Sequence, residues 1–294
     1  MLVMRPLRAA FRALSVTLGF LCGAGAAAAD PAMWVVKDAD STVYLLGTIH
    51  LMKPGVSWRS EKLDAALTSS SEYWMEADLE VDPAVLQTYA LNFGMDSRKS
   101  LASSVGEDNF RRFVELAERY EIPTRDLHQM RPWLATVVLS HAQMVSLGYD
   151  PDLGVDRTLQ KESIAAGKAI KPLETAAEQL GFFADLPDPI AADLLIQTLN
   201  EVEEGEKIID ALQTAWLAGD EKQLQKVAFD RMREEAPELF EVLLKRRNDN
   251  WVKQIDALLK GSGTQFVAVG AAHLLGKDGL PDQLAKRGYK VQRY

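Results

Sequence analysis

The chain has 294 residues, of which 47% are hydrophobic, and a formal net charge of −9. This length and apolar content are enough for a large hydrophobic core. An acidic chain without a basic run is poorly suited to bind nucleic acid, so we expect no nucleic-acid partner.

The N-terminal 29 residues have the order of a secretory signal. A basic start is followed by an apolar run and by small residues ending at Ala29. This order predicts cleavage between Ala29 and Asp30 and export to the periplasm or the medium. A retained N-terminal anchor is the alternative. The apolar run is short for a bilayer, and no other segment is long and apolar enough, so we expect no stable membrane span in the mature chain.

Residues 30–294 are then expected to form a single domain. The one cysteine, Cys22, belongs to the leader. The exported chain therefore has no disulfide and no thiol nucleophile, and any metal site in it must use His, Asp and Glu.

The first third of the mature chain predicts a strand, a helix and a second strand. Residues 41–47 form a β-branched and aromatic run, residues 58–70 have helical spacing, and residues 72–79 are extended again. Glu76 lies near the end of the second strand.

The middle of the chain is mostly helical. Residues 83–121 predict one or two helices, and a short extended run over 168–174 ends at Glu174. The spacing of apolar residues and the stop signals predict further helices over residues 132–148, 155–167, 176–186, 190–219, 220–232 and 236–261.

The last thirty residues repeat the order of the first third, with a strand at 263–270, a helix at 280–288 and a strand at 289–294. We therefore expect an α/β fold. Its central sheet is formed by two duplicated β-containing units at the chain ends, with a largely helical middle.

A glycine followed three residues later by a histidine ends the first strand of each unit. Residues 44–52 read YLLGTIHLM and residues 267–275 read VAVGAAHLL, so His50 and His273 occupy matching positions. Ligands of open α/β sheets bind beyond the carboxyl ends of such strands. We expect the two histidines to face each other across one crevice. Alternatively, each is a hydrogen-bonded core or turn residue.

The other two histidines have no such context. His141 lies on an apolar stripe of the predicted helix 132–148, so we expect a core histidine. His128 lies in a predicted loop and has no evident role.

Two glutamates extend the candidate site. Glu76 with the two histidines makes a common ligand set for a catalytic divalent metal, with positions left for water and substrate. A surface position is the alternative for Glu76. Glu174 either lies in the same cleft, as a catalytic base, or pairs with the N-terminus of the next helix.

Arg247 lies on the apolar stripe of the predicted helix 236–261. A buried arginine must pair with a carboxylate or bind an anionic group. It could orient Glu76, stabilise an oxyanion, or form a purely structural ion pair. Asp156 either caps its helix or lines the site.

At these residues the chain resembles the TraB/GumN family, which also includes the Tiki proteases. The resemblance extends from about residue 33 to 294. It implies a fold similar to erythromycin esterase and ChaN, and metal-dependent hydrolysis with Mn²⁺ or Co²⁺. It transfers site roles to His50, Glu76 and His273, and also to Arg247. The matching motifs are LLGTIHL, EADLE, MRPW, GVDRTL, KPLETAAEQL, RRNDNW and VAVGAAHLLGKDGL.

The sequence thus predicts an exported metal-dependent hydrolase of the peptidase class, with a peptide or a small molecule as substrate and Mn, Co or Zn as the metal. One alternative is a metal-independent, esterase-like hydrolase in which a histidine activates water. The other is a binding protein that sequesters a small peptide or a haem-like ligand without turnover.

Export is the first testable prediction. Because cleavage is expected after Ala29, N-terminal sequencing of the protein from its host should start at Asp30. A soluble intracellular protein that retains Met1 would contradict the prediction.

Overall fold

The most apolar stretches of the chain form two adjacent parallel strands. β2 (Ser41–Thr48) pairs along its whole length with β5 (Gly263–Gly270), and nearly all of their side chains are buried. Runs of this kind are typical of strands that are covered on both faces. The computed structural model describes residues 30–78, 82–202 and 205–294, so the predicted signal over residues 1–29 lies outside the described residues.

β2 and β5 lie at the centre of a mixed six-stranded sheet with the order β4-β3-β5-β2-β1-β6. β1 is antiparallel to both of its neighbours, whereas the other pairs are parallel. The remaining strands are β1 (Met33–Lys37), β3 (Glu72–Met75), β4 (Ala169–Pro172) and β6 (Lys290–Arg293).

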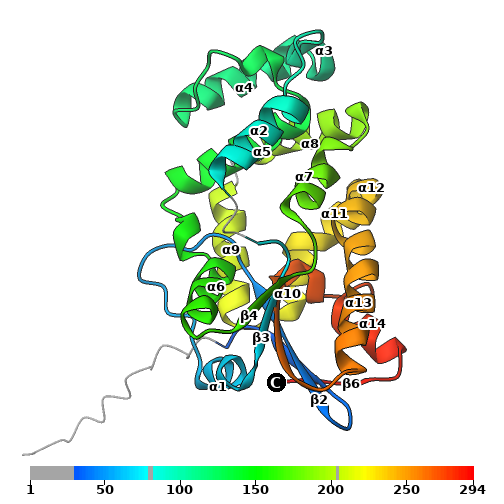
Figure 1. Cartoon of the computed structure of the whole chain (residues 1–294). Helices are drawn as coiled ribbons and strands as arrows, with labels where there is room; N and C mark the ends of the chain where they lie inside the picture. The colour runs from blue at the N-terminus through cyan, green and yellow to red at the C-terminus, as the bar shows by residue number, and fades with distance from the viewer. Residues whose placement is uncertain (1–29, 79–81, 203–204) are drawn as a thin grey trace, which may run out of the picture.

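Helices fill most of the rest of the described chain, and α13 and α14 lie on one side of the sheet with α1 and α6 on the other (Figure 1). The helices are α1 (Glu61–Ser69), α2 (Pro83–Gly94), α3 (Leu101–Val105), α4 (Glu107–Arg119), α5 (Pro132–Ser146), α6 (Val155–Ala165), α7 (Ala176–Ala184), α8 (Asp188–Glu201), α9 (Gly205–Leu217), α10 (Glu221–Gln225), α11 (Arg231–Glu235), α12 (Pro237–Phe240), α13 (Arg246–Leu259) and α14 (Leu280–Lys286). Short 3₁₀ turns occupy Leu127–Gln129, Pro151–Leu153 and Ala271–Leu274, and π-helical turns occupy Lys226–Asp230 and Glu241–Lys245.

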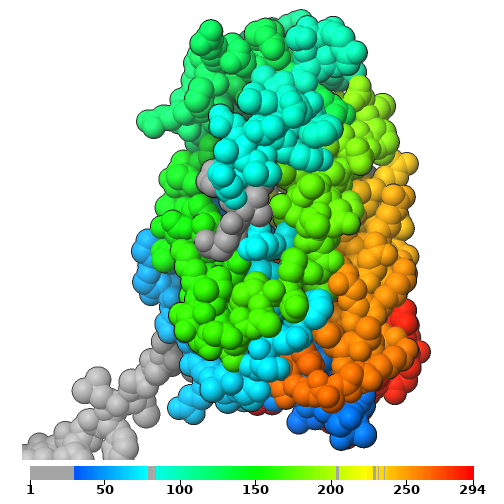
Figure 2. All heavy atoms as spheres, in the orientation of Figure 1, coloured from blue at the N-terminus to red at the C-terminus, as the bar shows by residue number. Residues whose placement is uncertain are grey.

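Three hydrophobic cores lie within the described residues. The largest packs both faces of the sheet against α1, α6, α13 and α14, and another joins α5, α7, α8 and α12. A third set of buried side chains joins α3, α4, α5 and α8 above the sheet. In the space-filling view these helices, drawn in cyan and green, form the upper part of the visible face (Figure 2). No helix in the described ranges is long and apolar enough to cross a membrane.

The α/β class and the helical middle are confirmed, but the duplication of the two end units is not. β2 continues through α1 to β3, whereas β5 continues through α14 to β6 at the opposite edge. The ladder also pairs Gly47 with Val269, so the register differs by one residue from the alignment of the two glycine motifs. The parallel strands β2 and β5 still end at the same edge of the sheet, and ligands of open α/β sheets bind beyond the carboxyl ends of such strands.

Two helix predictions also need correction. The run predicted as one helix over 190–219 forms α8 and α9, and 83–121 contains three helices rather than one or two. Gly106, the residue between α3 and α4, has a φ of 85°, a conformation that glycine adopts without strain and that ends a helix. β1 was not predicted, although its Trp34-Val35-Val36 run is followed by an Asp- and Ser-rich turn, which is a usual strand signal.

Candidate active site

An exposed histidine and a carboxylate form the outer part of the site. His50 follows the end of β2, and its Nδ1 lies 2.8 Å from Asp156 Oδ2. The His50 side chain is 56% exposed, whereas Asp156 is buried. The negative charge of Asp156 raises the pKa of His50 from 6.5 to about 9, and burial only partly opposes this shift.

The backbone brings these two side chains together. The amide of Val155, at the start of α6, donates to the carbonyl of Ile49, which ties the helix start to the exit of β2. Gly154 precedes the helix, and any Cβ at this position would collide with the His50 carbonyl. Asp156 therefore does not cap α6. It lies in the first helical turn and faces His50.

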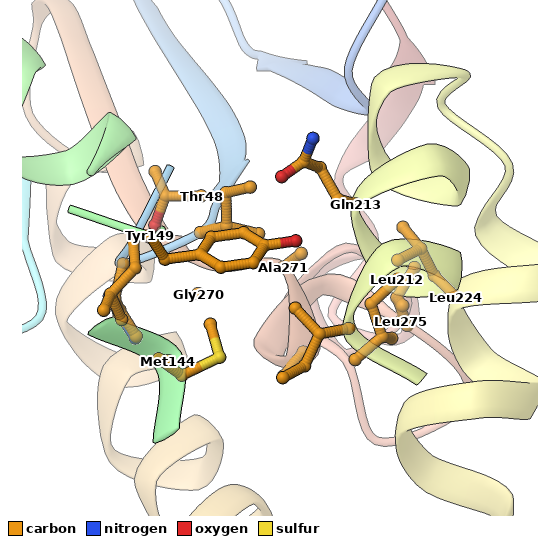
Figure 3. A pocket seen from close by; sticks show the side chains of 14 residues that line it. Thr48, Met144, Tyr149, Leu212, Gln213, Leu224, Gly270, Ala271 and Leu275 are labelled. Carbon is orange, nitrogen blue, oxygen red and sulfur yellow. The ribbon is translucent and has the colours of Figure 1, made fainter. Parts of the chain in front are cut away.

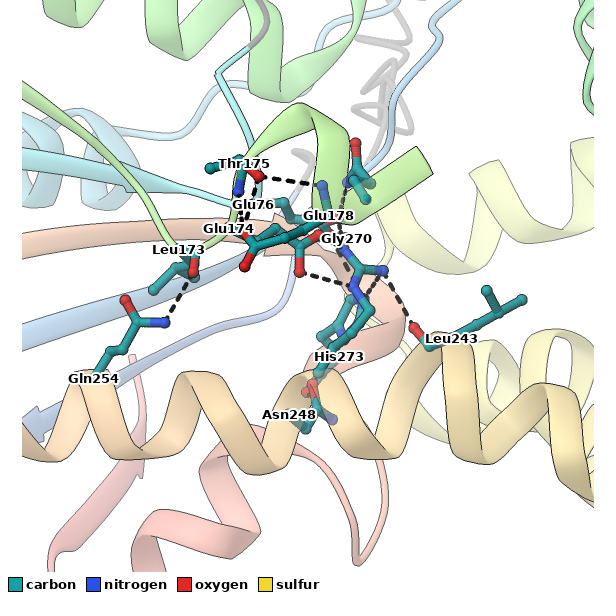
Figure 4. A network of polar contacts seen from close by, with 12 residues as sticks. Glu76, Leu173, Glu174, Thr175, Glu178, Leu243, Asn248, Gln254, Gly270 and His273 are labelled. Atoms are coloured by element: carbon teal, nitrogen blue, oxygen red, sulfur yellow. Dashed lines mark hydrogen bonds and ion pairs between the residues drawn. The ribbon is translucent and has the colours of Figure 1, made fainter. Parts of the chain in front are cut away.

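Two glutamates lie side by side where β3 and β4 end. The pairing of these parallel strands continues beyond them, since the amide of Glu174 donates to the carbonyl of Glu76. Thr175 and Glu178 form a capping box that starts α7 directly afterwards. Figure 4 shows Glu76 and Glu174 next to each other, with His273 approaching from the other side.

A buried arginine joins these groups. Arg247 Nη2 lies 2.6 Å from Glu76 Oε2 and 2.5 Å from Glu174 Oε1, and its Nε donates to Glu174 Oε2 at 3.2 Å. Its Nη1 donates to the Leu243 carbonyl at 3.2 Å and lies 3.1 Å from His273 Nε2. Guanidinium has five N–H donors, and all five are used by the protein. Arg247 therefore positions Glu76 and has no free donor for an oxyanion.

Aromatic rings complete the surroundings of this cation. The guanidinium carbon lies 4.6 Å from the ring centre of Trp251 and 5.4 Å from that of Phe182. Contacts of this kind favour a desolvated cation. The expected burial of the apolar stripe of helix 236–261, with Arg247 in it, is confirmed.

His273 is the inner histidine and is only 3% exposed. Its Nδ1 lies 2.7 Å from Asn248 Oδ1, while the Asn248 amide nitrogen donates to the carbonyls of His273 and Asp278. Nδ1 must then carry the proton, and Nε2 accepts from Arg247. This neutral tautomer agrees with burial, which lowers the pKa of His273 to about 3.

The pKa values of the two carboxyl groups are shifted in opposite directions. Burial acts to raise the pKa of Glu76, but His273, Arg247 and His50 outweigh it and lower the pKa to about 2. Since His273 is neutral, the responsible charges are those of Arg247 and His50. Burial raises the pKa of Glu174 in spite of its bonds to Arg247. Glu76 is therefore a fixed negative charge at all ordinary pH values.

A cavity of about 430 Å³, here called the polar cavity, opens over these groups. Its polar lining includes Thr48, His50, Glu76, Asp156, Arg157, Gln179 and Arg247. Glu174 and His273 are not part of its lining and are buried next to Glu76 and Arg247.

The predicted metal ligands meet around Gly270. A Cβ at this glycine would lie 3.0 Å from Glu76 Oε1, 3.6 Å from His50 Nε2 and 3.8 Å from His273 Cδ2. However, Glu76 Oε1 accepts from the Gly270 amide at 2.6 Å, and His273 Nε2 faces the Arg247 cation. As arranged, these donors do not fit a metal ion, and the described residues contain no group of three or more His, Cys, Asp or Glu placed to hold one. The metal site stays a prediction.

The structure thus brings together all five predicted side chains, His50, Glu76, Glu174, Arg247 and His273. The sequence gave no sign of the role of Asn248, which fixes the tautomer of His273, or of Gln179, which donates to Glu76 Oε2 at 3.1 Å. Neither amide stands out among many in the chain. The prediction for His141 was wrong, because its side chain is exposed.

Comparison with known proteins supports the family resemblance. The chain matches the TraB/PrgY/gumN family over residues 32–293. It belongs to this family. It is 23% identical over 254 residues to the uncharacterized protein YbaP of Escherichia coli (strain K12). The aligned region covers 86% of this chain and 92% of that protein. The same values hold for the uncharacterized protein YbaP of Shigella flexneri. No solved structure matches the chain.

The buried network generates a stability prediction. Arg247→Leu leaves Glu76 and Glu174 buried without their cation, so the free energy of unfolding should fall by about 3–5 kcal/mol. Urea denaturation measures this. Arg246→Leu is the matched control, because Arg246 is 65% exposed and should change stability little. Equal stability of the two variants would contradict a structural role for Arg247.

The two histidines should respond differently to substitution. His273→Ala leaves Asn248 Oδ1 and an Arg247 donor unpaired, at roughly 1–3 kcal/mol for each group. His50→Ala removes a side chain that is 56% exposed and forms one ion pair, so it should lower the melting temperature less than His273→Ala does, while turnover is lost. Thermal unfolding and activity of both variants, measured side by side, test this. A His50→Ala variant as unstable as His273→Ala would refute the distinction.

Proposed function

We propose that the chain is an exported hydrolase of carboxylic ester or amide bonds and that His50 is its acid–base residue. The observation that carries the proposal is the exposed His50 imidazole, held by Asp156 at the edge of the polar cavity. A histidine oriented through one ring nitrogen by a carboxylate leaves the other nitrogen for proton transfer.

In the proposed reaction, neutral His50 takes a proton at Nε2 from a water molecule in the polar cavity, and the water oxygen attacks the substrate carbonyl. The resulting imidazolium is stabilised by Asp156. It returns the proton to the leaving alcohol or amine as the bond breaks. Arg157 lines the same cavity and supplies positive charge to the developing oxyanion.

The inner network has a positioning role in this mechanism. Both oxygens of Glu76 are engaged, one by Gly270 and the other by Arg247 and Gln179. Both oxygens of Glu174 are engaged by Arg247. Neither carboxylate has an oxygen free to accept a proton as a general base. Their hydrogen bonds instead hold the ends of β3, β4 and β5 in place around His50.

The metal-dependent peptidase predicted from the sequence requires a different arrangement of the same donors. A divalent ion bound by His50, Glu76 and His273 would lower the pKa of a coordinated water. A direct assay decides between these alternatives. Ester and peptide substrates are tested with chelator and with Mn²⁺, Co²⁺ or Zn²⁺ added. Chelator-resistant turnover supports the proposal, and turnover that needs an added metal contradicts its metal-free form.

A non-catalytic binding protein remains the alternative class. The same assay addresses it, because a protein that only sequesters a ligand converts no substrate under any of these conditions. Binding without turnover would overturn the hydrolase proposal.

The pKa of His50 gives a pH profile. Because only neutral His50 accepts a proton, kcat/KM should rise about tenfold per pH unit below pH 9 and level off above it. Asp156→Asn removes the charge that raises this pKa, so the midpoint should move toward 6.5 while the maximal rate falls. Asp193→Asn, at an exposed residue of α8, is the control and should keep the wild-type profile. A midpoint unaffected by Asp156→Asn would exclude His50 as the titrating base.

The same pair predicts a pH-dependent stability. The pKa of His50 is higher in the folded state than in the unfolded state, so the ion pair stabilises the fold fully below about pH 6.5 and loses this effect as the pH rises through 9. The melting temperatures of wild type and Asp156→Asn should therefore differ more at pH 6 than at pH 10. A constant difference would contradict the linkage.

A further inference from the structure

A second cavity, of about 300 Å³, lies on the other side of His50, and we call it the apolar pocket. Figure 3 shows Met144 and Tyr149 on one wall and Leu212, Leu224 and Leu275 on the opposite wall. Ile209 of α9 and Ala271 of the 3₁₀ turn after β5 complete it. Among the described residues, no Asp, Glu, Lys or Arg lines this pocket.

The two cavities meet at one point in the fold. Thr48, His50 and Leu51 line both of them. A substrate whose scissile carbonyl lies at His50 must therefore direct one substituent toward the polar cavity, with its charged lining, and can direct the other into the apolar pocket. Burial of an unpaired charge in the apolar pocket would be costly, so the second substituent has to be uncharged.

The walls of the apolar pocket are held in place from outside. The Tyr149 hydroxyl donates to Asp210 at 3.2 Å, and Lys53 Nζ lies 4.9 Å from the centre of its ring. On α9, the indole of Trp216 donates to the Gly47 carbonyl at 2.8 Å. A pocket with fixed walls binds an apolar group with little loss of conformational freedom.

Two polar atoms at the same pocket lack partners. Thr48 Oγ1 and Gln213 Oε1 are buried and accept no hydrogen bond within the described part of the chain, and both residues belong to the lining. Unpaired buried polar atoms are uncommon in folded proteins. A ligand that carries a polar group next to its apolar chain would satisfy them.

We propose that the apolar pocket binds an uncharged aliphatic or aromatic substituent of the bond that His50 hydrolyses. The substrate class is thus an ester or amide with one apolar and one polar substituent. This inference rests on the proposed function. A volume of 300 Å³ lies at the lower limit for small-molecule sites, which suits a short acyl chain or one side chain rather than an extended peptide.

The first experiment measures binding without catalysis. Acetate, butyrate, hexanoate and octanoate are titrated into the protein by calorimetry at pH 7, where His50 is protonated and can pair with the carboxylate. Affinity should increase about fourfold per added methylene until the pocket is full. Affinity that does not depend on chain length would overturn the proposal.

Two pocket variants and a matched control locate the effect. Leu212→Trp fills the pocket, so the affinity should no longer increase from butyrate to octanoate. Met144→Ala enlarges the pocket, so the affinity should continue to increase with chains longer than those that fill the wild-type pocket. Leu91→Trp makes the same replacement at a leucine that is 60% exposed on α2, and should behave as wild type. If Leu212→Trp does not fold, Met144→Ala alone tests the pocket. An unchanged chain-length profile in the folded pocket variants refutes the proposal.

The second experiment measures turnover of two ester series, one with the acyl chain varied and one with the alcohol varied. The series whose kcat/KM follows the chain-length profile of binding, and loses it in Leu212→Trp, identifies the substituent that enters the pocket. Binding that depends on chain length, without any turnover, contradicts the proposed hydrolase activity but supports the proposed binding of an apolar group in the pocket. Turnover that is insensitive to length in both series supports the hydrolase and refutes the pocket.

Discussion

The burial of one guanidinium determines how this site is built. A buried cation needs every donor satisfied. The acceptors for Arg247 come from the ends of β3 and β4, from the turn after β5 and from the π-helical turn before α13. These acceptors come from segments far apart in the sequence. The ion pairs therefore fix the carboxyl edge of the sheet, and the shape of the polar cavity above it follows from them.

This constraint gives the two histidines different roles. His273 is an acceptor within the network, and its neutral state is set by Asn248 and Arg247. His50 is outside the network, exposed, and charged because of Asp156. Matching positions in a sequence motif thus correspond to different chemistry, because β2 and β5 lead into different connections. β2 is followed by a loop to α1 that contacts the start of α6, whereas β5 is followed by a 3₁₀ turn that contacts α13.

Local patterns were sufficient to predict much of the fold. The strand predictions at 41–47 and 263–270 agree with β2 and β5, because these are apolar runs bounded by turn residues. The grouping of His50, Glu76, Glu174, Arg247 and His273 followed from their positions at strand ends and on one helix stripe. Two kinds of feature could not be predicted. Asn248 and Gln179 orient His273 and Glu76 through single hydrogen bonds, and neither amide is part of a recognisable motif. The apolar pocket is lined by residues of α9, and no local sequence pattern predicts where this helix packs.

The separation of the two cavities has a consequence for how such proteins diverge. The residues that bond to Arg247 constrain one another, so a change at one of them disturbs the others. Leu212 and Leu224 make only packing contacts with the pocket, so each can change in size without altering the charge network. The ligand preference that we propose for the apolar pocket can therefore change through single substitutions in this chain while the ion pairs around Arg247 are retained.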